Sequence, residues 1–163
     1  MRRSLRRSRP PIAVGPGESV LAWAEATDGT AVAGTRDALY VGDDRLPWEQ
    51  VEAAAWDSDA DLLRVTEVGT WGQERATYAL SFDQPDRLLQ LVRERVTASV
   101  VLQRHVAVDG RRGLRVIARR APRGDRPVAW FYEYDEGVDP AHPAVREAAE
   151  SALSAAREEL GQH

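Results

Sequence analysis

The sequence predicts an α+β fold: a small antiparallel β-barrel or sandwich capped by a helix, then a β-hairpin or three strands, and a C-terminal helix. Three observations predict this fold. Residues 82–101 carry apolar side chains at a helical step, and short strand patterns lie on both sides of them. Residues 143–160 carry a second helical apolar face. Several short strands followed by one amphipathic helix are typical of a small capped barrel or sandwich.

Residues 1–17 are predicted to be a disordered, Arg-rich leader, because a run of Pro and Gly ends the segment. Its five arginines are Arg2, Arg3, Arg6, Arg7 and Arg9. Removing these five from the 22 basic residues leaves 17 against 26 acidic residues, a net charge of −9 for residues 11–163. An acidic body argues against a specific nucleic-acid-binding face on the folded part. The leader has three interpretations. It is a solvated tail, it results from a start codon assigned too far upstream, or it tethers the protein to anionic membrane or nucleic acid.

Six short strands are predicted between the leader and the first helix. They cover residues 19–26, 30–35, 38–41, 46–56, 61–68 and 75–82. Turn sequences separate them, such as Asp28-Gly29 and the glycines at positions 69 and 72. The fourth strand has Pro47 near its start, and its alanines at 53–55 would also tolerate a helix.

The helix within residues 82–101 has both a start signal and an apolar stripe. Asp83 suits the first turn as an acceptor of backbone N–H groups, and Pro85 suits it because no N–H is needed there. The stripe consists of Leu88, Val92, Val96 and Val100, flanked by Leu89 and Leu91. Because β-branched residues follow position 95, the helix is expected to end anywhere up to Leu102.

Residues 18–101 resemble the bacterial pleckstrin-homology-like (PH-like) domain. The matching residues are Thr35-Arg36, Leu39-Tyr40-Val41 and Leu46-Pro47-Trp48-Glu49-Gln50-Val51, with residues 85–101 as the closing helix of that family. The resemblance implies a small barrel and a binding role. Phosphoinositide binding is not expected, because the first hairpin loop, residues 27–30, carries an acid and no base. The whole chain also resembles a small family of uncharacterised bacterial proteins.

Residues 102–163 are predicted to form a second part that packs back on the first. Strands are expected at residues 104–108, 113–120 and 127–135, and a helix at 143–160 that Gly161 ends. The apolar face of that helix consists of Val145, Ala149, Ala152, Leu153, Ala156 and Leu160.

The residues that could carry chemistry are few. The chain has no cysteine, which excludes disulfides and thiolate sites and suits a reducing, cytoplasmic location. No apolar run approaches the roughly 20 residues of a transmembrane helix. Residues 57–61 copy the start of a calcium loop, but Leu62 stands where glycine is required and Val68 where a bidentate glutamate belongs. We therefore expect no metal, cofactor or catalytic set.

The strand at residues 128–135 gives the clearest candidate surface, because it alternates aromatic and acidic positions. Val128, Trp130, Tyr132 and Tyr134 share one face, and Ala129, Phe131, Glu133 and Asp135 share the other. One interpretation pairs the acids with arginines of the neighbouring strand. The other makes the aromatic residues, with Arg119 and Arg120, a partner surface. Trp71 joins this candidate surface because residues 69–72 indicate a hairpin tip.

These observations favour a non-enzymatic protein- or peptide-binding module, whose partner is another protein or a second copy of the chain. The first alternative is the Arg-rich tether, which would lose salt-sensitive binding to anionic surfaces on deletion of residues 2–9. The second is a small enzyme centred on His105 with an acid such as Glu133.

We predict a homodimer formed through the strand of Trp130, Tyr132 and Tyr134 or through the Trp71 hairpin tip, because strand edges offer unpaired backbone groups. The alternative is a monomer whose aromatic residues face the C-terminal helix. Light scattering of the wild type and of Trp71→Ala separates the two. A wild-type mass near the 18.1 kDa of one chain would exclude the dimer, and a dimer that survives Trp71→Ala would point to the aromatic strand.

Overall fold

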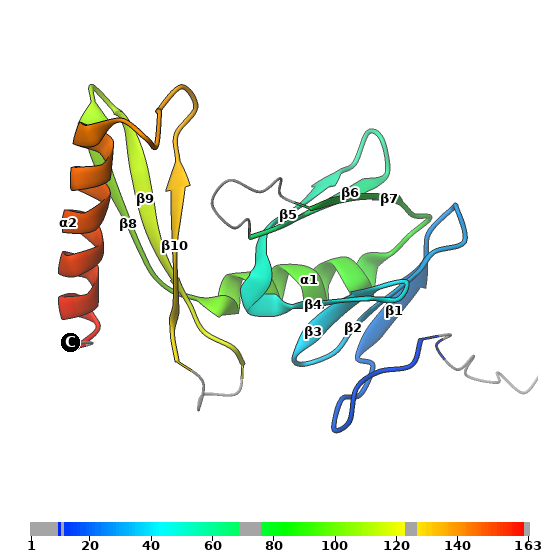
Figure 1. Ribbon diagram of the computed structural model, residues 1–163. Coiled ribbons are helices and arrows are strands. Elements are labelled where there is room, and N and C mark those ends of the chain that lie inside the picture. The colour runs from blue at the N-terminus through cyan, green and yellow to red at the C-terminus, as the bar shows by residue number, and fades with distance from the viewer. Residues whose placement is uncertain (1–9, 11, 69–75, 123–126, 162–163) are drawn as a thin grey trace, which may run out of the picture. The chain divides into compact units, whose positions relative to one another are not determined.

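The computed structural model describes residues 10, 12–68, 76–122 and 127–161 (Figure 1). The α+β class is confirmed, with two α-helices and three antiparallel sheets in these residues. The sheets stay open, so the described strands close no barrel. The chain divides into two compact units, unit 1 at residues 1–96 and unit 2 at residues 97–163.

The first sheet of unit 1 is a four-stranded meander. It consists of β1 (Ala22–Glu25), β2 (Ala31–Gly34), β3 (Ala38–Val41) and β4 (Asp44–Pro47), in that order. Gly29 and Gly42 have φ of 90° and 59° in the turns after β1 and β3, a conformation that glycine adopts without steric cost. All four residues of β3 are buried. Leu39 and Val41 enter the core, whereas Tyr40 projects from the opposite face of the sheet.

The predicted strand at residues 46–56 is wrong, because a short 3₁₀ helix (Trp48–Gln50) divides it. The helix separates β4 from β5 (Val51–Asp57), and thereby starts a second sheet. The physical reason is Trp48, which is fully buried and whose Nε1–H donates to the carbonyl of Thr35 at 2.9 Å. An extended chain at this point would carry the indole away from that acceptor.

The second sheet of unit 1 has the order β5-β6-β7, with β6 at Leu62–Glu67 and β7 at Thr77–Ser81. The predicted hairpin tip with Trp71 lies outside the described residues. Tyr78 of β7 donates its hydroxyl to Asp44 of β4 at 3.0 Å, which ties the second sheet to the first. Burial and the Asp44 carboxylate raise the pKa of Tyr78 to about 12.

The predicted helix of unit 1 is confirmed as α1 (Asp86–Ser99). Leu88, Leu89 and Val92 are buried in the core, and Val96 packs against it. Val100, the last residue of the predicted stripe, instead begins the next strand, since β-branched residues favour extended backbone. Helix and sheet approach closely at Gly34, where a Cβ atom would lie 2.5 Å from Cδ2 of Leu91.

Unit 2 contains three strands and a helix, which decides between the hairpin and the three-strand alternatives. The strands are β8 (Val100–Asp109), β9 (Arg112–Arg119) and β10 (Ala129–Tyr134), in the order β10-β9-β8. The helix α2 (Pro143–Glu159) contacts β8 and β9. Its buried residues meet the apolar side chains of the sheet, and together they form one core: Leu102, Leu114, Val116, Ala118, Val145, Ala149 and Ala156. Gly161 has φ of 70° just after the helix, as predicted for its end.

Gly113 sits where the β8–β9 pairing is irregular. It pairs with Ala107 beside a register shift, and a Cβ atom there would lie 1.8 Å from the backbone oxygen of Val106. Backbone cannot move aside as a side chain can, so this position requires glycine.

We expect Gly113→Ala to lower the free energy of unfolding by about 3 kcal/mol, because the new methyl group forces the two strands apart. Gly110→Ala, in the turn of the same hairpin, is the control. Its Cβ meets nothing within 4 Å and only the left-handed φ of 61° is strained, which costs about 1 kcal/mol. Urea unfolding measures both, and equal losses would contradict the close contact at Gly113.

Candidate functional site

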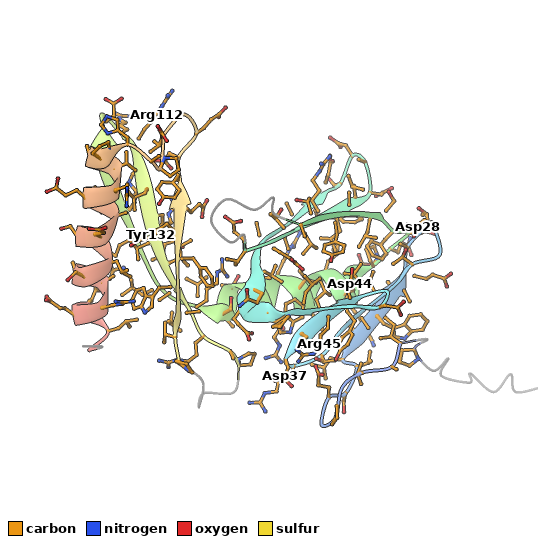
Figure 2. All side chains as sticks on the ribbon, in the orientation of Figure 1. Asp28, Asp37, Asp44, Arg45, Arg112 and Tyr132 are labelled. Atoms are coloured by element: carbon orange, nitrogen blue, oxygen red, sulfur yellow. The ribbon has the colours of Figure 1, made fainter. Side chains whose placement is uncertain are left out.

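The aromatic face of β10 belongs to the interior of unit 2. Trp130, Tyr132 and Tyr134 are half-buried and pack against the core cluster that includes α2 residues (Tyr132 is labelled in Figure 2). The rings of Tyr132 and Tyr134 lie 6.2 Å apart, and burial raises the pKa of both hydroxyls. Packing against the C-terminal helix was predicted as the alternative to a dimer through this strand.

One arginine of the predicted partner surface, Arg119, is separated from those rings. Arg119 pairs with Ala129 across the sheet, so its side chain lies on the face opposite Trp130, Tyr132 and Tyr134. It is only 4% exposed, and its Nη1–H donates to Oγ of Ser99 at 2.9 Å. Arg120 is exposed, and Trp71 lies outside the described residues. Arg119 therefore does not share a surface with the aromatic residues of β10.

The structure instead brings four charged or titratable side chains together on the other face of this sheet. Arg115 of β9 pairs with Glu133 of β10 on one side and with His105 of β8 on the other. Arg115 Nη1 lies 3.8 Å from Oε1 of Glu133, and His105 Nε2 lies 2.8 Å from Oδ2 of Asp135, the residue that follows β10. We call Glu133, Arg115, His105 and Asp135 the charged row. Their side chains are between 34% and 41% exposed.

The acid that contacts His105 is Asp135, whereas the enzyme hypothesis named Glu133. Arg115 stands between His105 and Glu133 in the register of the three strands. Asp135 Oδ2 also accepts the backbone N–H of Gly113 at 2.8 Å. The hydrogen bond from His105, and then that from Gly113, hold the pKa of Asp135 below its ordinary value of 3.8.

A His–Asp pair also occurs in catalytic triads, where the acid orients the histidine that acts as base. A nucleophile would have to lie within hydrogen-bonding reach of the imidazole. Asp135 is the one hydrogen-bond partner of the His105 side chain among the described residues. In the same part of the chain, no group of three His, Asp or Glu side chains could hold a metal ion.

A second cluster, in unit 1, centres on Glu18, whose side chain is 6% exposed. Its carboxylate accepts hydrogen bonds from the hydroxyl of Thr35 at 2.7 Å and from that of Tyr40 at 2.6 Å. Arg45 reaches the same carboxylate, with Nε 3.3 Å and Nη2 3.4 Å from its oxygens (Arg45 is labelled in Figure 2). Gly15 donates its backbone N–H to Oη of Tyr40 at 3.0 Å. We call Thr35, Tyr40 and Arg45 the donor triad.

Opposing effects set the charge of Glu18. Burial on its own would raise the pKa, but the hydrogen bonds from Tyr40, Thr35 and Arg45 outweigh it, so the pKa falls below its ordinary value of 4.5. This cluster could not be predicted from the sequence, because its members lie as far apart as positions 18 and 45. The one available signal was the β3–β4 hairpin, whose register places Arg45 opposite Tyr40.

Comparisons of the sequence with protein-family models and with curated proteins find no match. Within the described residues, no helix is long and apolar enough to cross a membrane.

We expect Asp135→Asn to destabilise the protein at pH 6 and to cost much less at pH 3. The pKa of Asp135 is lower in the folded state than its ordinary value of 3.8. The ionised side chain therefore stabilises the fold fully at pH values well above 3.8, and this stabilisation is lost as the pH falls toward the lower pKa of the folded state. Thermal unfolding across this pH range measures the difference. Glu133→Gln, whose partner lies farther away at 3.8 Å, is the control and should show a smaller loss. An unchanged cost of Asp135→Asn at both pH values would contradict the ionised pair.

Proposed function

We propose that the chain is a non-enzymatic protein-binding module that meets its partner through the charged row of unit 2. The observation that carries this proposal is the row itself: two acids, an arginine and a histidine on three adjacent strands, each about one third exposed. Unit 1 supports the binding role through its two antiparallel sheets and single amphipathic helix. That arrangement is consistent with the PH-like resemblance, which we retain as part of the proposal.

The charged row contributes more to partner recognition than to the stability of the fold. Ion pairs at such exposure contribute about 0–1 kcal/mol to folding, because water screens them and the side chains lose rotamer freedom. The same charges do far more at an interface, since like charges brought together there cost several kcal/mol. Charge order therefore selects a partner even where it contributes little to the fold.

The neighbours of the charged row give it an apolar margin. Phe131 of β10 projects on the same face as Glu133 and is half-buried. Ile117 of β9 stands opposite Phe131 in the register but is only 4% exposed, so of these two Phe131 is the one offered to a partner. Aromatic residues and arginine are enriched at protein interfaces, and Phe131 and Arg115 are residues of these two kinds. The partner that fits is a protein surface carrying charges in the complementary order, an acid facing Arg115 and a base facing Glu133.

We expect the double variant Arg115→Glu with Glu133→Arg to weaken partner binding by at least about tenfold, which corresponds to 1.4 kcal/mol. The swap preserves the internal ion pair but reverses the order of charge that a partner meets. Affinity purification from the native host, followed by titration of any partner found, measures the change.

The control is Arg104→Glu with Glu159→Arg, which reverses an exposed pair between β8 and α2. It should leave binding intact. Equal retention of partners by the two double variants would contradict the charged row as the binding surface. Turnover in a broad hydrolase screen that disappears in His105→Ala would replace the binding proposal with catalysis.

A further inference from the structure

The segment before β1 crosses the outer face of the first sheet, and we call residues 12–18 the N-terminal strap. Residues 15–18 form a tight turn in which Glu18 donates its N–H to the carbonyl of Gly15 at 3.1 Å. Pro16 at the second position and Gly17 at the third, with φ of 78°, are the requirements of a type II turn. The turn directs the Glu18 side chain toward Tyr40, which projects from the face of the sheet opposite the core.

The donor triad is arranged by the sheet. Oγ1 of Thr35 accepts the N–H groups of Asp37 and Ala38, both at 3.1 Å. Its own hydrogen has two acceptors in reach, Oε1 of Glu18 at 2.7 Å and the carbonyl of Ala38 at 3.3 Å, and the shorter contact is the one to Glu18. Tyr40 and Arg45 stand on paired strands, and Arg45 Nε also donates to Oη of Tyr40 at 3.2 Å. Three donors fixed in advance around one carboxylate are the components of a receptor for that group.

The N-terminal strap contacts the sheet closely at some residues and leaves a hollow beneath others. Beneath Ile12 and Ala13 is a hollow of about 210 Å³, whose other walls include Ala31, Tyr40 and Gly42. Pro16 and Ser19 are exposed, whereas the Glu18 side chain is 94% covered, with 6% exposed. Both the Glu18 carboxylate and the N–H of Gly15 anchor the strap to Tyr40, so a group that competes for the donor triad also competes with the strap.

We propose that Thr35, Tyr40 and Arg45 form a carboxylate-binding site, which Glu18 of the same chain occupies. When the strap lifts, an acidic peptide that presents glutamate in a Gly-Pro-Gly-Glu turn binds there in place of Glu18. This site lies in unit 1 and is independent of the charged row. The strap acts as a tethered competitor, because an attached ligand acts at an effective concentration of the order of millimolar. A free peptide therefore binds well only when Glu18 is removed or displaced.

The first experiment uses the full chain with Glu18→Ala and a peptide of residues 12–21, capped at both ends so that its glutamate is the one carboxylate. We expect this peptide to bind at least about tenfold more tightly than the same peptide with Gln in place of Glu. The preference should disappear on adding Arg45→Gln and persist on adding Arg64→Gln, an exposed arginine of β6. The wild-type chain should bind the glutamate peptide at least about tenfold more weakly than the Glu18→Ala chain.

Acetate provides a second measurement, because Glu18→Ala removes a CH₂–COO⁻ group that acetate replaces. At pH 7 and constant ionic strength, exchanging chloride for acetate should raise the Tm of the Glu18→Ala chain by about 2 °C. The wild type and the chain with both Glu18→Ala and Tyr40→Phe should not respond. Glu18→Gln takes the place of Glu18→Ala in the peptide experiment if circular dichroism shows that the alanine variant is unfolded. A folded variant that binds both peptides equally, or neither, overturns the proposal, as does an absent acetate response of folded Glu18→Ala.

Discussion

The buried indole of Trp48 is the constraint on which the rest of unit 1 depends. Its N–H donates to Thr35 at 2.9 Å, and leaving such a donor unpaired in the interior would cost about 1–3 kcal/mol. That bond fixes the 3₁₀ turn where the chain leaves the first sheet and enters the second. The hydroxyl of the same Thr35 meets Glu18 on the outer side, so one residue connects the core with the N-terminal strap.

The elements of the fold that could be predicted are those that the pattern of neighbouring side chains determines. Both helices, and the strands whose residues alternate, follow from side-chain periodicity alone, which is a property of neighbouring residues. The break at Trp48 could not be predicted in this way, because it depends on an acceptor 13 positions earlier. Alternation also predicted that Trp130, Tyr132 and Tyr134 share a face, but not that this face packs against the core of unit 2 with α2.

The candidate sites were less predictable than the fold, for the same physical reason. The charged row depends on the register of three strands, and the partner of His105 changed from Glu133 to Asp135 once that register was known. The cluster around Glu18 depends on a segment folding back across a sheet. Both arise from contacts between distant positions, on which composition and periodicity carry no information. The two sites also differ in kind, since water screens the charged row while the sheet encloses the Glu18 carboxylate.

The close approach of Gly34 to Leu91 has a consequence for how sequences of this fold can change. No side chain fits at position 34 while Leu91 keeps its place, because even a methyl group would overlap its Cδ2. A smaller residue at position 91 would open that space, so a substitution at either position alters what the other tolerates. The residue at position 34 and the side chain at position 91 therefore constrain each other, although 57 positions separate them in the chain.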